Sequence, residues 1–173
     1  MMAMSLDGYV ARKNHSLDWL NKQPTQNEDH GFFDFMDSVD ALVMGSGSLK
    51  TVLGFCEWPY VKPVVVLSRS MTKQELPEHL RDKVEFSRAS PQELWEVFSE
   101  AGYKRIYVDG GAVIRSFLNA GLVQDMKITM VPILLGGGIR IFGETACDVD
   151  LELVSAAPFP SGMVDLVYKL KAS

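Results

Sequence analysis

The chain has 173 residues, of which 47% are hydrophobic and 23% are charged. This length and composition are typical of one globular domain with a single core, and they argue against a disordered, fibrous or membrane-embedded chain. No apolar run approaches the roughly 20 residues that cross a bilayer, and the N-terminus lacks the pattern of a signal peptide, so we expect no membrane contact and a cytoplasmic location. The formal net charge is −5 without a dense Lys/Arg cluster, which argues against nucleic acid and favours a small molecule as the partner.

The cysteines and histidines form no metal-binding pattern. Cys56 and Cys147 lie far apart, and no histidine stands at ligand spacing from either cysteine or from another histidine. We therefore expect no metal.

Three short apolar runs predict strands in the first two thirds of the chain. Residues 40–45 (DALVMG), 63–68 (PVVVLS) and 105–111 (RIYVDGG) are continuous and bounded by polar or turn-forming residues. A strand that is covered on both faces has this pattern, so we expect three strands of a largely parallel sheet.

Helical patterns alternate with these strands. Thr25 with Glu28, and Ser90 with Glu93, fit capping boxes that begin a helix, and the apolar residues after Gly111 keep helical spacing. Strands that alternate with helices predict a parallel sheet covered by helices on both faces.

The last third of the chain has a different pattern. Residues 126–134, 150–156 and 163–171 contain alternating apolar and polar stretches with no helix between them, which predicts antiparallel strands in the same sheet. We therefore predict a single domain over residues 1–173 with a three-layer α/β/α fold, a mixed, mostly parallel sheet and antiparallel C-terminal strands.

Gly110 and Gly111 stand where a strand gives way to a helix. Free backbone N–H groups and the positive end of a helix dipole meet at such a junction, which is the chemistry of an anion site. A backbone without Cβ atoms would let a pyrophosphate approach closely, although the two glycines could equally serve only a tight turn.

Residues 44–52 (MGSGSLKTV) form a second junction between a strand and a helix. The segment lacks the third glycine of the dinucleotide fingerprint and the ending of a P-loop, so it fits neither motif. What remains is a helix start rich in the hydroxyl groups of Ser46, Ser48 and Thr51. Two helix starts that face one crevice would suit the phosphates of a dinucleotide.

A buried strand ends in Ser68 and Arg69. An acidic residue at this position would suit a free ribose 2′-hydroxyl, whereas hydroxyls beside an arginine suit a 2′-phosphate. If a dinucleotide binds, NADP is therefore the better candidate; otherwise this is an ordinary solvated strand end.

Three acidic residues near the N-terminus have two interpretations. Asp7 precedes Gly8 in a turn, and Glu28 and Asp29 fall in the first turn of a predicted helix, where the helix dipole favours acids. Glu28 or Asp29 could instead be a buried acid that faces a cleft.

Taken together, these segments resemble the dihydrofolate reductase-like family, specifically its branch related to the C-terminal reductase domain of the bifunctional riboflavin-biosynthesis deaminase-reductases. The resemblance covers about residues 3–169. It is carried by the order and spacing of MSLDGYVA (4–11), SVDALVMGSGSL (38–49), VVVLSR (64–69), IYVDGGAVIRSFL (106–118) and ITMVPILLGGGIRIF (128–142).

The resemblance implies a three-layer α/β fold that holds NADPH across the ends of the strands. It places Ala3, Val10 and Ala11 near the nicotinamide, and Ser68 and Arg69 at the 2′-phosphate. The residues implied to border the remaining phosphates and the adenosine ribose are Gly45, Ser46, Ser48 and Leu49, with Gly110, Gly111, Ala112, Val113 and Ile114 at the pyrophosphate. Ser46 departs from the family, which usually has a basic residue there.

The resemblance also suggests substrate and catalytic residues. Residues 29–45 align without gaps with true dihydrofolate reductases, which places Asp29 at the position of their buried acid and Phe33 at that of a phenylalanine that contacts substrate. Trp19 and Trp58 lie in loops that would set specificity, and they would form either pocket walls for a flat ring or part of the core.

These expectations combine into one reaction class. We expect an NADPH-dependent oxidoreductase that transfers a hydride to the C=N or C=O carbon of a small heterocyclic or imine-like substrate. The proton source would be Asp29, if it is buried, or an ordered water, and Asp7 is the next candidate. The alternatives are a riboflavin-pathway pyrimidine reductase and a non-catalytic nucleotide-binding or dimeric interaction protein. The alternating apolar face of residues 163–171 would permit a homodimer, which we expect.

Overall fold

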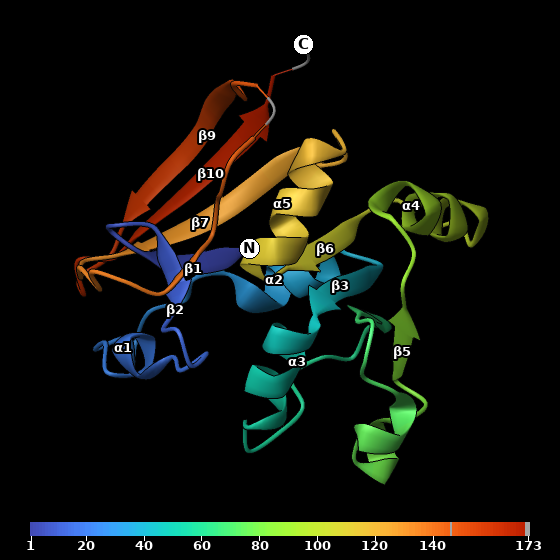
Figure 1. Ribbon diagram of the computed structural model, residues 1–173. Coiled ribbons are helices and arrows are strands. Elements are labelled where there is room, and N and C mark those ends of the chain that lie inside the picture. The colour runs from blue at the N-terminus through green and yellow to red at the C-terminus, as the bar shows by residue number, and fades with distance from the viewer. Residues whose placement is uncertain (146, 172–173) are drawn as a thin grey trace.

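The computed structural model describes residues 1–145 and 147–171, which form two main sheets flanked by helices (Figure 1). The first sheet has the order β5-β4-β3-β6, and each neighbouring pair is parallel. Its strands are β3 (Ala41–Gly45), β4 (Val64–Leu67), β5 (Val84–Ser87) and β6 (Ile106–Asp109).

The second sheet has the order β1-β7-β10-β9. Strand β1 is parallel to β7, and the other two pairs are antiparallel. The strands are β1 (Met2–Ser5), β7 (Asp125–Val131), β9 (Leu151–Pro158) and β10 (Val164–Leu170), and a separate antiparallel pair consists of β2 (Tyr9–Ala11) and β8 (Ile139–Arg140). The hydroxyl of Tyr107 in β6 donates to the backbone oxygen of Met1 at 2.7 Å, which links the two sheets.

Helices cover both faces of the parallel sheet because successive side chains of a strand point to opposite sides. Leu42 and Met44 of β3 pack against α2 and α3, whereas Ala41 and Val43 pack against α4 and α5. The helices are α1 (Asp18–Asn21), α2 (Phe32–Asp37), α3 (Ser46–Leu53), α4 (Pro91–Glu100) and α5 (Gly111–Asn119), with short 3₁₀ turns η1 (Lys73–Glu75) and η2 (Glu78–Leu80). The predicted α/β fold with parallel strands and antiparallel C-terminal strands is confirmed. The expectation that both kinds of strand share one sheet is wrong, because β7, β9 and β10 pair with one another and with β1 and not with the parallel strands β3 to β6. No helix in the described residues is long and apolar enough to cross a membrane.

Most predicted elements are present, and α4 begins as the capping box at Ser90 predicts, with its Oγ accepting the N–H of Glu93 at 3.3 Å. The helix start predicted at Thr25 is wrong, because α2 begins only at Phe32. The carboxylate of Glu28 accepts the N–H and the hydroxyl of Ser161, at 2.7 and 2.6 Å, instead of capping a helix. Strand β5 was not predicted, since its sequence is only four residues long and includes an exposed glutamate.

Candidate functional site

A cavity of about 1040 Å³ lies where β3 and β6 end and where α3 and α5 begin. Its other walls come from β1, β2 and the segment between β2 and α2. Ligands of open α/β sheets bind outside the carboxyl ends of the strands, and this cavity is as large as the largest ordinary small-molecule sites. The cavity is therefore the candidate site.

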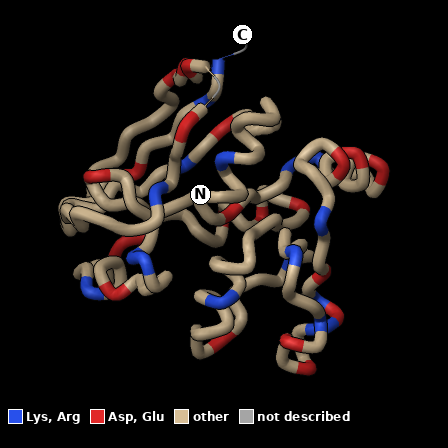
Figure 2. The backbone as a smooth tube through the Cα atoms, in the orientation of Figure 1, with Lys and Arg blue, Asp and Glu red and all other residues tan. Residues whose placement is uncertain are grey.

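The helices that begin at the cavity have no side-chain caps. Neither Gly45, which precedes α3, nor Gly110, which precedes α5, offers a capping side chain, whereas α4 begins away from the cavity and is capped by Ser90. The first N–H groups of α3 and α5 thus remain available to a ligand. No lysine or arginine belongs to the described lining of the cavity. Along the backbone the Lys and Arg positions are scattered and do not gather in one region (Figure 2). The helix ends are therefore the main positive features of the cavity, which suits an anion bound by backbone groups.

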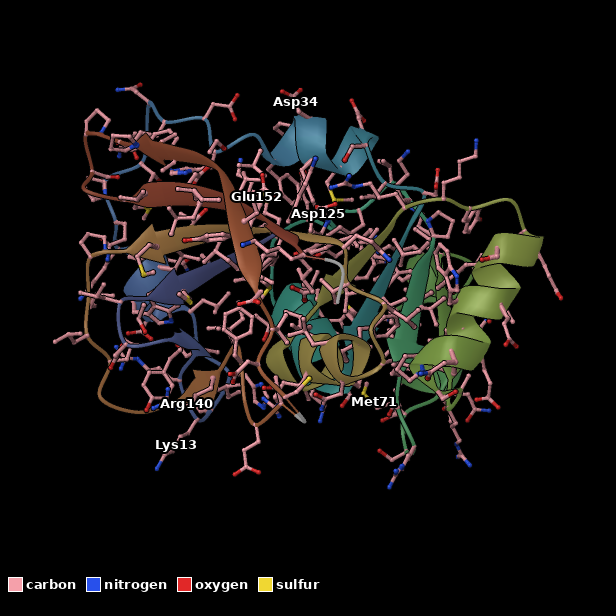
Figure 3. All side chains as sticks on the ribbon, turned by 90° about the horizontal axis from the view of Figure 1, so that it is seen from above. Lys13, Asp34, Met71, Asp125, Arg140 and Glu152 are labelled. Carbon is pink, nitrogen blue, oxygen red and sulfur yellow. The ribbon has the colours of Figure 1, made fainter. Side chains whose placement is uncertain are left out.

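The two glycines at the start of α5 also have packing reasons. Gly110 has φ +90°, and a Cβ on it would collide with the side chain of Ser48 in α3. A Cβ on Gly111 would collide with the backbone oxygen of Arg140, which lies in β8 (Figure 3). From the local sequence, Gly110 and Gly111 could serve either a tight turn or an anion site. The structure requires the glycines for the turn and for close packing, and it also directs the helix start towards the cavity.

His15 lies beside the start of α3. Its ring is so close to Gly47 that a Cβ there would stand 2.7 Å from Cε1, and its backbone has φ 66°. The side chain is exposed and lines the cavity. Sequence reasoning missed this residue, which places an imidazole near the position where Ser46 stands instead of a basic residue.

Most of the expected cofactor residues line this one cavity. They are Ala3, Val10, Ala11, Gly45, Ser46, Ser48, Gly110, Gly111, Ala112 and Val113. Leu49 does not line it, because it is fully buried in the core, and Ile114 packs in the cluster around Val10 and Ile141.

Ser68 and Arg69 lie just beyond the cavity. Leu67, the last residue of β4, still lines it. The Ser68 hydroxyl accepts the N–H groups of Ser70 and Met71, at 3.3 and 3.0 Å, and so shapes the turn, while the Arg69 side chain is exposed.

Asp7 is engaged in the fold and does not line the cavity. Its carboxylate accepts the Ser5 hydroxyl at 2.6 Å and the N–H groups of Leu135 and Gly136, at 3.1 and 2.7 Å. The hydrogen bond from Ser5, followed by those from the two backbone groups, lowers the pKa of Asp7 to about 2. An acid held in its ionised form is a poor proton donor, so the placement of Asp7 as second catalytic candidate is not supported.

Asp29 is not a buried acid, which corrects the expectation from the alignment. Its side chain is exposed, lies outside the cavity lining and accepts the N–H of Gly31 at 2.7 Å. The neighbouring residue, His30, reaches the cavity instead. The helix α2 begins after Gly31, later than predicted, so Asp29 precedes the helix and does not take the expected position that faces the cavity.

The three expected substrate contacts also fall outside the cavity lining. Phe33 is 78% exposed, and its neighbour Phe32 lines the cavity, since successive helical side chains point about 100° apart. Trp19 is completely buried beside Val131 and Met163, which is core packing. Trp58 packs edge-on against Tyr60 at 5.3 Å between ring centroids, and Tyr60 is the residue that lines the cavity.

Sequence reasoning missed an acid at the start of α5. Asp109 ends β6 and lines the cavity, and it accepts the hydroxyl of Tyr107 at 3.1 Å. Burial raises the pKa of its carboxyl. The sequence signal for Asp109 was its position at the end of a predicted strand, directly before Gly110 and Gly111.

A second missed group surrounds His30. Its Nδ1 lies 2.9 Å from Oδ1 of Asp165, which also accepts the hydroxyl of Thr129 at 2.7 Å. Lys127 contacts the other oxygen of Asp165 at 3.1 Å and also donates to the backbone oxygen of His30. Burial raises the pKa of Asp165, but the hydrogen bonds from Thr129, His30 and Lys127 outweigh it, so the net shift is downward. The sequence signal for the residues around His30 was an acid, Asp165, within the apolar pattern of a predicted strand.

Comparison with known proteins places the chain in a family. Residues 1–164 match the family described as the RibD C-terminal domain. The Bacillus subtilis (strain 168) protein YyaP is 29% identical over 96% of this chain and 91% of its own, and YwjB of the same organism is 28% identical over 91% and 89%.

Solved structures give the same assignment. A putative riboflavin biosynthesis protein from Shewanella sp. PV-4 is 40% identical, has a TM-score of 0.91 and is matched over 99% of this chain and 97% of its own. The diaminohydroxyphosphoribosylaminopyrimidine deaminase/5-amino-6-(5-phosphoribosylamino)uracil reductase of Thermotoga maritima is 17% identical with a TM-score of 0.66, and this chain spans 55% of its length, so it shares the fold. The chain thus belongs to the RibD C-terminal domain family, as its motif order and its layered fold both indicate.

Proposed function

We propose that the protein is an NADPH-dependent reductase that transfers a hydride to a small heterocyclic or imine-like substrate. The observation that carries the proposal is the meeting of two uncapped helix starts, those of α3 and α5, at one large cavity. When bound, NADPH would supply the hydride from its nicotinamide ring.

The residues present fit such a cofactor. The N–H groups that follow Gly45 and Gly110 would bind the pyrophosphate. They would stabilise its negative charge at a place where the described cavity lining has no lysine or arginine. Arg69 would meet the 2′-phosphate, and Arg88, which donates to its backbone oxygen at 2.8 Å, adds a second guanidinium nearby. Ala3 and Ala11 would leave room for the flat nicotinamide ring against β1 and β2.

The family supports a reductase related to the pyrimidine reductases of riboflavin synthesis. A riboflavin-pathway pyrimidine reductase is therefore the second candidate, suggested by the name of the Thermotoga maritima relative. Its substrate carries a phosphate in addition to those of the cofactor. The described cavity lining holds no lysine or arginine for that phosphate, which favours a smaller, uncharged substrate.

The test is a titration of the purified protein with NADPH and NADH, followed by tryptophan fluorescence. We expect NADPH to bind at micromolar concentrations and more tightly than NADH. If neither cofactor binds below millimolar concentrations, the reductase proposal fails and a non-catalytic interaction protein becomes the better explanation. If NADPH binds, its oxidation at 340 nm with dihydrofolate, the pyrimidine intermediate, cyclic imines and quinones would identify the substrate class.

We also propose that two copies of the chain associate through β9. The expected apolar face of residues 163–171 belongs to β10, which lies between β7 and β9 and so has no free edge; pairing of two sheets edge to edge would use β9. Strand β9 is the edge of its sheet, and all eight of its residues are exposed, including Leu151, Leu153 and Val154. An antiparallel pair of such edges is self-complementary about a two-fold axis and would cover this apolar surface.

A further inference from the structure

We propose that the imidazole of His15 binds the pyrophosphate of the cofactor beside the start of α3. This inference rests on the proposed function, because it needs a dinucleotide in the cavity. It adds a side chain to a phosphate site that was so far built from the backbone N–H groups of two helix starts.

His15 lies against the first turn of α3. A Cβ on Gly47, the second residue of α3, would stand 2.7 Å from Cε1, 3.0 Å from Nδ1 and 3.7 Å from Nε2 of the ring. This is the turn whose first N–H groups have no side-chain cap. His15, Ser46, Gly47 and Ser48 all line the cavity, so an anion bound at this helix start would lie beside the imidazole.

Gly47 makes room for this ring. Glycine is a poor helix former, and the backbone of Gly47 does not have the positive φ that would require it. The neighbour that would meet a Cβ at this position is the ring of His15. The glycine therefore allows the imidazole to pack on α3 at the edge of the cavity.

The loop that carries His15 holds it in an unusual conformation. Among the non-glycine residues that the structure describes, only His15 has a positive φ, at 66°. Its N–H donates to the backbone oxygen of Arg12 at 2.9 Å, and its own backbone oxygen accepts the hydroxyl of Thr51 from α3 at 3.4 Å. Arg12 in turn forms an ion pair with Asp18 at 2.6 Å. These contacts fix the loop against α3, so the ring is already in place when a ligand enters.

His15 can supply a positive charge that no acid neutralises. The other histidine of the cavity lining, His30, is 2.9 Å from the carboxylate of Asp165. His15 forms no ion pair with an acid among the residues that the structure describes. An imidazole donates an N–H to a phosphate oxygen whether it is neutral or protonated, and a bound anion favours the protonated ring. The ring thus adds a charge-assisted hydrogen bond to the partial charge of the helix start.

The pyrophosphate, and not the 2′-phosphate, is the group that His15 would meet. Arg69, which we propose for the 2′-phosphate, follows β4, whereas His15 packs on the helix that follows β3. NADPH and NADH share the pyrophosphate, and only NADPH has the 2′-phosphate. A change at His15 should therefore affect both cofactors by the same factor.

The test is a fluorescence titration of His15→Asn with NADPH, NADH and ADP-ribose. Asparagine tolerates a positive φ as well as histidine does, so the backbone of the loop should be preserved. We expect the affinity for all three ligands to fall by about tenfold, the effect of one lost hydrogen bond to a charged group. The matched variant His79→Gln, altered at an exposed position in η2, should bind as wild type.

The variant His15→Lys separates charge from packing, because it keeps a cation and removes the ring. It should bind all three ligands at least as tightly as wild type. Unchanged affinity in His15→Asn, a loss confined to NADPH, or His15→Lys binding no better than His15→Asn would overturn the proposal for His15. Failure of wild type to bind either cofactor would instead overturn the proposed function.

The variant Gly47→Ala tests the position of the ring while His15 itself is retained. Its Cβ should displace the imidazole from α3 and weaken the binding of NADPH and NADH alike, by about fivefold, whereas the Tm should not fall, because alanine is the better helix former. In the His15→Asn background the same change should have little further effect on binding. Wild-type affinity in Gly47→Ala, or an equal loss in both backgrounds, would overturn the placement of the imidazole at the pyrophosphate.

Discussion

The backbone oxygen of Arg140 lies where a Cβ atom on Gly111 would stand, so β8 packs directly on the first turn of α5. Replacing Gly111 with alanine should force β8 and α5 apart and lower the free energy of unfolding by about 1–3 kcal/mol, the usual effect of overpacking. Urea denaturation measures the loss. Gly137→Ala is the control, because a Cβ there meets nothing within 4 Å. Equal stability of the two variants would show that the close approach of Arg140 to Gly111 does not exclude a Cβ atom at position 111.

The proposed anion site should respond to charge at the start of α5 without loss of the helix. Ala112 is exposed and lines the cavity, so Ala112→Asp places a carboxylate among the N–H groups proposed for the pyrophosphate. An acid in the first turn stabilises a helix by about 0.3–1 kcal/mol, so we expect a more stable fold but at least tenfold weaker NADPH binding, on the order of 1.4 kcal/mol. Ala112→Asn has a similar shape without the charge and should bind nearly normally. Equal binding by both variants would place the phosphates elsewhere.

Arg69 should set the preference between the two nicotinamide cofactors. It lies just past β4 with an exposed side chain, and only NADPH carries the 2′-phosphate that it would contact. Arg69→Gln should weaken NADPH binding about tenfold and leave NADH binding unchanged, since one charge-assisted contact is lost. Arg81→Gln, at another exposed arginine outside the cavity lining, is the control. A parallel loss of affinity for both cofactors would indicate a structural role for Arg69.

The elements that could be predicted from the sequence are those with local signals. Strands β3, β4 and β6 are continuous apolar runs, and Ser90 with Glu93 caps α4 through residues three positions apart. The wall of the cavity formed by the starts of α3 and α5 was also predictable, because helix starts that follow parallel strands gather at one edge of a sheet.

The wall of the cavity near His30 depends on contacts between distant residues. Glu28 looked like a helix-capping acid, but its partner Ser161 is 133 residues away, and this contact delays the start of α2. His30 meets Asp165 across 135 residues. The expected position in the cavity is taken by His30 and not by the adjacent Asp29. Tertiary packing, and not the spacing of residues in the sequence, decides which of two neighbours faces the cavity.

The proposed association through β9 predicts a change in mass. The wild-type chain should sediment at twice 19.2 kDa at micromolar concentration. Leu153→Lys places a charge on the exposed edge strand, where lysine opposes strand pairing, and should yield the monomer. Leu134→Lys is the control, because Leu134 is 69% exposed but lies outside β9. A monomeric wild type, or a dimer that persists in Leu153→Lys, would contradict the proposal.

Asp7 should make stability depend on pH in the acid range. Its pKa in the folded protein is about 2, below the ordinary 3.8, because Ser5, Leu135 and Gly136 donate hydrogen bonds to the ionised carboxylate. A group with a lowered folded pKa stabilises the protein above its unfolded pKa, and this contribution is lost as pH falls through the folded value.

Asp7→Asn keeps the shape of the side chain but removes its negative charge, and the NH₂ group of asparagine cannot accept the hydrogen bonds that one carboxylate oxygen accepts. We therefore expect a lower Tm than wild type at pH 7, a similar difference at pH 5, and a difference that shrinks between about pH 4 and pH 2. Thermal unfolding followed by circular dichroism at these pH values measures it. NADPH affinity at pH 7 should remain near the wild-type value, since Asp7 lies outside the cavity lining. A Tm difference that stays constant down to pH 2 would show that the charge of Asp7 does not stabilise the turn.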